Sequence, residues 1–288
     1  MNLLVVFASA SMFCAGLNDF VFKRYVSKNR PQGVYLALIG VFWSLIFLSA
    51  AVFSGGLRFD RNTLVYGLVC GFFSIAAQVF FLEGLRKIKA SIGATIYRLN
   101  FVVVVILAPV FLHETLTVYK LAGIFLAIVA VFLLAGDGNC LETGFRRSAT
   151  IPVLLVTAAS ILRGFMGFFY KVAQLNCVDT NTFLFLNPLL WIVGGIIYAV
   201  FFERAAVRNT DKRLVAYSGI SSVLIAGIAL FLLLAVKSGE AIAAVPITQM
   251  SFVVTGIFSV WLLKERVTRF NAAGIACALG TIICLSIR

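Results

Sequence analysis

Two arginines lie inside long apolar stretches of this 288-residue chain, where a charged side chain needs a chemical reason. Arg98 lies within "ASIGATIYRLNFVVVVILAPVFL" (90–112), and Arg163 lies twelve residues into the apolar run that begins at 151. A planar guanidinium forms paired hydrogen bonds with carboxylates and phosphates. At the centre of a membrane helix it costs about 2.5–3.5 kcal/mol on insertion scales, so it is expected to face a partner or a wet cavity. The two arginines therefore predict an anion-binding cavity inside a membrane protein.

The elements that must position these arginines are apolar runs of about 20 residues, the length of a bilayer-spanning helix. The chain is 62% hydrophobic and 12% charged with a mean hydropathy of +1.06, whereas soluble proteins are about one quarter charged. The sequence predicts an all-α polytopic membrane protein. Its ten transmembrane helices are expected at 2–22, 33–53, 63–83, 91–112, 118–136, 151–170, 181–202, 215–236, 241–263 and 269–287.

An internal repeat divides these ten spans into two sets of five. The loop 137–150 separates a first repeat (1–136) from a second repeat (151–288), and an offset of 151 residues aligns their C-terminal parts. At this offset Glu114, Thr117 and Gly123 match Glu265, Thr268 and Gly274. Because each repeat has an odd number of spans, the two repeats must be inverted relative to each other. Inverted repeats are typical of alternating-access transporters, which bind substrate near the bilayer midplane.

The repeated motif resembles a known family. In this chain it is "LHETLTVYKLAGIFLAIVA" in the first repeat and "LKERVTRFNAAGIACALGT" in the second. Both segments are similar to those of the EamA branch of the drug/metabolite transporter superfamily. The resemblance implies ten spans, with a cavity lined by spans one to four and six to nine and with spans five and ten outside. Family members often carry a proline midway along spans four and nine, where this chain has "RLNF" and "QMSF".

The orientation in the membrane has two conflicting indications. Sixteen Lys and Arg residues fall in loops on one side of the predicted spans and six on the other, so the positive-inside rule predicts both termini outside. The family resemblance instead implies that both termini are cytoplasmic. Either way we expect a multi-pass protein of the cell (inner) membrane. The net charge of +13 lies in short loops beside lipid headgroups, so no nucleic-acid partner is expected.

The candidate substrate site follows from the repeat. Arg98 has Gln249 as its repeat-mate, and Asn100 has Ser251, so these polar pairs are expected to converge on the central cavity. The predicted substrate-binding residues are Arg98, Arg163, Gln249, Asn18, Asp19, Tyr97, Asn100, Ser251, Asn187 and Trp43. Two alternatives stay open: Arg98 could reach the basic interface as a snorkelling anchor, and the aromatic residues could form an interfacial belt.

Other features allow a structural and a functional interpretation. Asn187-Pro188 is expected to break the seventh span and free a carbonyl for the cavity. Glu114 and Glu265 could couple ions, but capping fits better, with each Thr capping the following helix and each Glu facing its N-terminus. The glycines of spans five, six, seven and ten are interpreted as helix contacts, with hinges as the alternative: Gly123, Gly164, Gly167, Gly194, Gly195 and Gly274.

The predicted function is secondary active transport of a small polar metabolite. The chain has one histidine, His113, and no CxxC pair, P-loop, HExxH or Ser/His/Asp set, so we expect neither an enzyme nor a metal or cofactor. The two membrane arginines favour an amino acid or an organic anion or zwitterion. The alternatives are a flippase for a lipid-linked sugar or phospholipid, and an exporter of drug-like compounds. The expected partners are the substrate, the lipid bilayer and a coupling proton or ion, for a monomer or homodimer.

Overall fold

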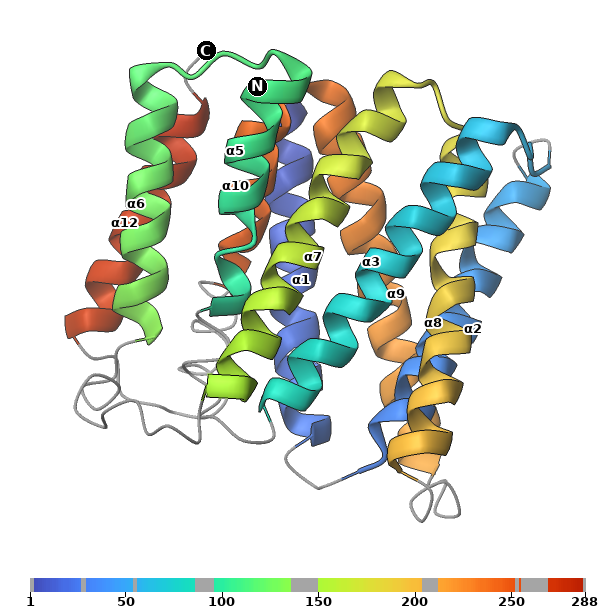
Figure 1. The fold of residues 1–288 in the computed structure, drawn as a ribbon. Helices are drawn as coiled ribbons and strands as arrows, with labels where there is room; N and C mark the ends of the chain where they lie inside the picture. Colours follow the sequence, from blue (N-terminus) through green and yellow to red (C-terminus); the bar gives the residue numbers. More distant parts are fainter. Residues whose placement is uncertain are drawn as a thin grey trace.

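The fold is a bundle of long helices (Figure 1). A computed structural model of the chain describes residues 3–26, 30–53, 56–85, 96–135, 150–203, 212–251, 254 and 269–286. Within these ranges the secondary structure is helical, without strands. The helices are α1 (Leu3–Val26), α2 (Gln32–Phe53), α3 (Arg61–Leu85), α5 (Phe101–Leu112), α6 (Val118–Ala135), α7 (Thr150–Leu175), α8 (Thr180–Phe202), α9 (Lys212–Ser238), α10 (Ala241–Gln249) and α12 (Arg269–Ser286).

The helices present their apolar side chains to the outside as well as to the core. Phe53, Val118 and Ile151 are 91%, 79% and 71% exposed, as expected for a surface that lies in lipid. Six helices, α1, α2, α3, α7, α8 and α9, are long and apolar enough to cross a membrane. Three shorter apolar stretches accompany them: Ile96–Leu112, Val118–Leu133 and Ala272–Leu285. The chain is therefore a multi-pass helical membrane protein, while the count of ten spans stays a prediction.

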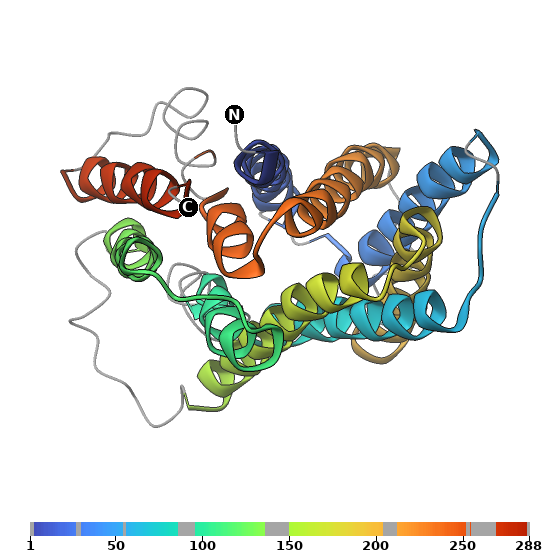
Figure 2. The same cartoon turned by 90° about the horizontal axis from the view of Figure 1, so that it is seen from above.

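The two repeats are joined helix against helix. The most extensive contacts pair α1 with α9, α2 with α8, α3 with α7, and α6 with α12, so each pair takes one helix from either repeat. α1 and α7, the first helices of the two repeats, run in opposite directions in Figure 1. α6 and α12 form a pair at one edge of the bundle when it is seen from above (Figure 2), in agreement with the expected outer position of spans five and ten.

A carboxylate at each end of the bundle caps a helix of the other repeat. Glu114 follows α5 and accepts the backbone N–H groups of Ala241 and Ile242 at 2.8 and 2.9 Å, where α10 begins. Glu203 ends α8 and accepts the first N–H groups of α2 at 2.9 and 2.8 Å. The expectation that Glu114 would face the helix that follows it is therefore wrong, because α10 offers its open N-terminus across the repeat interface.

The other part of the capping prediction is that Thr117 and Thr268 each cap the helix that follows them. The Thr117 hydroxyl accepts the N–H of Lys120 at 3.4 Å, so this threonine caps α6 as expected. The Lys120 ammonium forms an ion pair with Glu240, the residue before α10. Glu265 and Thr268 lie outside the described residues.

Glycines allow α2 and α8 to lie in close contact. A Cβ atom added to Gly195 would lie 2.4 Å from the backbone nitrogen of Ala37, and one added to Gly33 would lie 2.5 Å from that of Ala199. Two other glycines are equally crowded. A Cβ added to Gly194 would lie 2.3 Å from the Ile75 side chain, and one added to Gly164 would lie 2.5 Å from the Asn100 carbonyl oxygen. The packing interpretation is confirmed for these positions of spans six and seven. Small residues at such seams are what lets membrane helices associate.

We predict that Gly195→Ala lowers the melting temperature of the purified protein, because the new methyl group must push α2 and α8 apart. Overpacking of this kind costs about 1–3 kcal/mol. The matched control is Gly219→Ala, since an added Cβ at Gly219 meets nothing within 4 Å. Thermal unfolding in detergent measures both. Equal melting temperatures for the two variants would contradict the close contact.

Candidate functional site

Two helical paths turn at equivalent points of the repeats. Leu99 and Asn100 form a turn before α5, and Met250 forms one after α10. Here backbone N–H groups bond to carbonyls three residues back, as from Asn100 to Tyr97 (3.4 Å) and from Met250 to Ile247 (3.1 Å). The predicted spans four and nine are therefore not uninterrupted helices. Such tightened turns often mark functional positions, and in membrane proteins they are tolerated where the backbone is buried in protein or lines a cavity.

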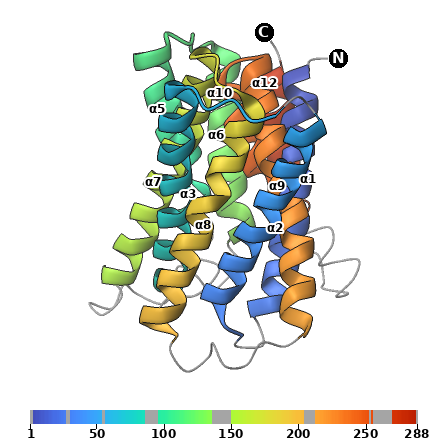
Figure 3. The same cartoon turned by 90° about the vertical axis from the view of Figure 1, so that its right-hand side faces the viewer.

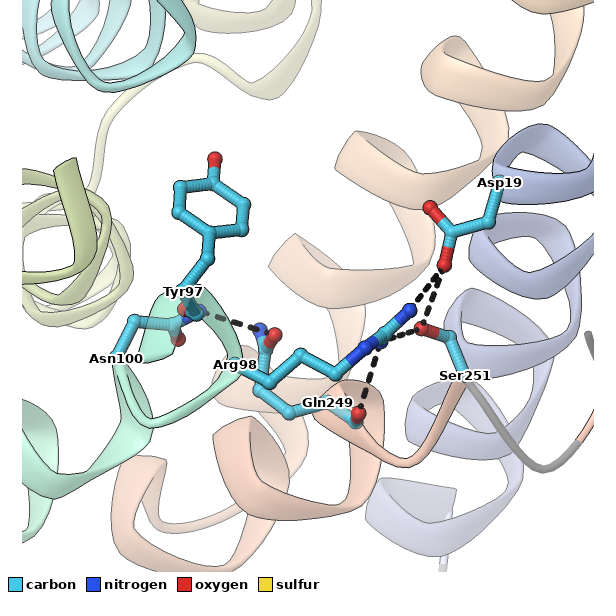
Figure 4. A network of polar contacts seen from close by, with 6 residues as sticks. All are labelled: Asp19, Tyr97, Arg98, Asn100, Gln249 and Ser251. Atoms are coloured by element: carbon cyan, nitrogen blue, oxygen red, sulfur yellow. Dashed lines mark hydrogen bonds and ion pairs between the residues drawn. The ribbon is translucent and has the colours of Figure 1, made fainter. Parts of the chain in front are cut away.

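Arg98 lies directly before the turn at Leu99 and Asn100, and its guanidinium binds three other residues (Figure 4). Its guanidinium donates to the Asp19 carboxylate of α1 at 2.5 Å and to the Ser251 hydroxyl at 2.6 Å. It also donates to the backbone carbonyl of Gln249 at 3.3 Å. The Asn100 amide donates to the side-chain oxygen of Gln249 at 3.1 Å. The structure thus brings together the repeat-mates that the sequence predicted to converge.

The environment of Arg98 excludes the snorkelling alternative. Its side chain is 18% exposed and its guanidinium is held by partners inside the bundle, not extended to a basic interface. The Asp19 side chain is 39% exposed, so this ion pair stays accessible from one side. Asp19 therefore neutralises Arg98 within the protein. An unpaired buried guanidinium would instead need an anionic ligand to neutralise it.

Arg163 has a different environment on α7. Its guanidinium has two partners among the described residues, the Ser74 hydroxyl at 3.4 Å and the Met166 sulfur at 3.5 Å. Both contacts are long, the thioether is a weak acceptor, and neither partner carries a charge. The indole N–H of Trp191 donates to the same Ser74 hydroxyl at 3.0 Å, so that hydroxyl is shared. Arg163 is a membrane cation without a carboxylate partner within the described part of the chain.

Aromatic side chains lie beside this cation. Trp43 meets Trp191 edge-on with ring centroids 5.9 Å apart, and both are at most 5% exposed. Tyr97 stacks on Phe81 at a centroid distance of 4.2 Å. These burials show that the two tryptophans do not belong to an interfacial belt, which would lie at the lipid surface. The Tyr97 side chain interacts electrostatically with Arg163, Asp19 and Arg98.

Asn187 and Asn18 are two further residues that the sequence predicted to bind substrate. Asn187 is fully buried within α8, and its amide donates to the carbonyl of Phe183 at 2.9 Å. α8 continues through Pro188, so the prediction of a broken seventh span is wrong; the asparagine amide binds within the helix instead. The side-chain oxygens of Asn187 and Asn18 and the indole nitrogen of Trp43 have no hydrogen-bond partner among the described residues.

The sequence prediction missed Ser74 as a contact of Arg163. Ser74 is 3% exposed and lies in the middle of α3 within "GFFSIAA". The signal was a hydroxyl in an apolar run, but serine is common in membrane helices because it can bond to its own backbone. Glu83, near the C-terminal end of α3, accepts a hydrogen bond from the Tyr198 hydroxyl at 3.0 Å.

Comparisons with known proteins agree with this architecture. The model of the EamA-like transporter family matches residues 2–136 and 150–287. An uncharacterised protein of Methanocaldococcus jannaschii is 32% identical over 122 residues, which cover 42% of this chain and 87% of that protein. A solved crystal structure superimposes with a TM-score of 0.81 at 17% identity, covering 97% of this chain and 98% of that one, which shows a shared fold.

We predict strong coupling between Arg98 and Asp19 in a double-mutant cycle of melting temperatures. Arg98→Gln leaves the Asp19 carboxylate without its cation, and Asp19→Asn leaves the guanidinium without its anion. Loss of one partner of a buried pair costs about 3–5 kcal/mol, less here because Asp19 is partly exposed. The double variant is therefore expected to be more stable than the sum of the single effects predicts. Arg61→Gln, at an exposed position at the start of α3, is the control for loss of a positive charge. Additive single effects would contradict the pairing.

Proposed function

This chain belongs to the EamA-like transporter family, and we propose that it is a secondary active transporter of a small anionic or zwitterionic metabolite. In this proposal ten spans form two inverted repeats, 1–136 and 151–288, that alternate access around a central site. An amino acid or an organic acid is the proposed class of substrate. The observation that carries the proposal is the contrast between the two membrane arginines.

The contrast assigns different roles to the two cations. Arg98 is neutralised by Asp19 and holds the turn of one repeat against Gln249 and Ser251 of the other. Arg163 has a hydroxyl and a thioether as its partners among the described residues. A guanidinium in a low-dielectric interior is stabilised most by an anion, so a substrate carboxylate at Arg163 completes the site.

The other candidate functions have less support from these contacts. A flippase needs a basic side chain for the lipid headgroup, but the Arg98 guanidinium is already bound by Asp19 and Ser251. An exporter of lipophilic cations needs a carboxylate for the cation, whereas the carboxylate at this site, Asp19, pairs with Arg98. A neutral or positive site favours the anionic or zwitterionic class.

The experiment is transport into proteoliposomes with Arg163 variants. We expect Arg163→Gln to reduce uptake of a labelled amino or organic acid at least about tenfold, because a hydrogen bond to a charged group contributes about 1.5–3 kcal/mol. Arg163→Lys keeps the charge without the planar fork and is expected to retain part of the activity. Ser74→Ala removes a weak partner and serves as a control for local packing.

Two outcomes would refute the proposal. One is uptake by a folded Arg163→Gln protein at the wild-type rate. The other is an absence of carboxylate transport together with scrambling of labelled phospholipids in the same vesicles. The second result would support a flippase.

A further inference from the structure

A groove opens between α2 and α9, away from the arginines. Its volume is about 410 Å³. Figure 3 shows these two helices side by side. The groove is lined by four residues of α2 and three of α9: Phe42, Leu45, Ile46, Ser49, Gly219, Ser222 and Val223. The α2 residues repeat every three or four positions and so form one stripe, about 10 Å long at 1.5 Å per residue.

The polar atoms of this groove are already bonded. The Ser49 hydroxyl donates to the carbonyl of Ile46 at 2.8 Å, and the Ser222 hydroxyl donates to the carbonyl of Gly219 at 2.7 Å. Each hydroxyl has one proton to donate, so neither requires a polar ligand. The other side chains of the lining, those of Phe42, Leu45, Ile46 and Val223, are hydrocarbon. The lining therefore fits an apolar occupant.

The groove faces the side of the bundle that lies in lipid. Leu45 and Val223, on its two walls, are 53% and 62% exposed, and both belong to helices that can span a membrane. A Cβ added at Gly219 would meet no atom within 4 Å, so the glycine leaves space where other residues would fill it. In a bilayer, acyl chains surround such a surface.

A basic rim lies at the end where both helices begin. Arg213 is exposed in the first turn of α9, six residues or about 9 Å before Gly219. The Arg30 guanidinium, just before α2, lies over the rings of Tyr25 and Tyr217 at 5.5 and 5.2 Å. Basic residues at the membrane surface attract anionic headgroups with about 1 kcal/mol each. A basic rim of this kind favours a lipid with an anionic headgroup.

We propose that the α2–α9 groove is a binding site for one acyl chain of an anionic phospholipid, whose headgroup lies at the rim formed by Arg30 and Arg213. The site does not include Arg98 or Arg163 and does not depend on which metabolite the protein carries. The bound lipid fills the space between a helix of each repeat, where protein packing alone leaves a groove.

Native mass spectrometry of the detergent-purified protein tests this site by titration with phosphatidylglycerol and phosphatidylcholine. The wild-type protein is expected to bind one phosphatidylglycerol in preference to phosphatidylcholine. Gly219→Leu fills the groove and should weaken this binding at least about tenfold, since each buried methylene of a lipid chain contributes about 0.8 kcal/mol. Ala122→Leu is the matched control, because Ala122 is exposed on α6, far from the groove.

A second variant separates the headgroup from the chain. Arg213→Gln should reduce the preference for phosphatidylglycerol over phosphatidylcholine while leaving the groove open. The proposal is overturned if Gly219→Leu binds phosphatidylglycerol as the wild type does, or if the wild type does not distinguish the two lipids. It is also overturned if Gly219→Leu dissociates a dimer without changing lipid binding, because a second copy of the chain would then occupy the groove.

Discussion

An arginine inside a bilayer-spanning bundle must find a counter-charge in the protein or take one from a ligand, because hydrocarbon cannot solvate it. This constraint governs the centre of the molecule. Arg98 meets it internally through Asp19, with Ser251 and the Gln249 carbonyl as further acceptors. Arg163 has uncharged partners in the described part of the chain. Because Arg98 has a carboxylate partner and Arg163 has none among the described residues, the site is proposed to prefer an anionic substrate.

The inverted repeat explains how the residues that bind Arg98 come together. Each repeat supplies one helical path with a turn near its middle, and the two turns meet because the repeats pair helix against helix. The turn at Asn100 releases backbone from regular helical bonding, and the side chain of Asn100 takes up the Tyr97 carbonyl at 2.8 Å. Contacts across the repeats also hold both ends, through Glu114 on α10 and Glu203 on α2. Any motion of one repeat against the other would break these charged contacts.

Much of this architecture could be predicted from the sequence, since apolar length predicts the helices and the offset of 151 predicts the two repeats. The pairing of α1 with α9, α2 with α8 and α3 with α7 was not predicted. The same offset predicted that Arg98 and Gln249 would meet, because symmetry-related positions lie near one axis. The sequence could not show that Glu114 caps α10 and not α6, because both helix N-termini offer the same N–H groups and only the packing decides. The intact helix at Pro188 was missed for a related reason: a proline disrupts a helix less when neighbouring side chains satisfy the backbone.

The central claim is that a substrate anion binds at Arg163, an arginine without a carboxylate partner among the described residues. The most direct measurement is a thermal-shift panel of carboxylates, amino acids and quaternary ammonium compounds on the purified protein. The account predicts that carboxylates or amino acids raise the melting temperature of the wild type and that this shift disappears in Arg163→Gln. Stabilisation by quaternary ammonium compounds with none by carboxylates would contradict it.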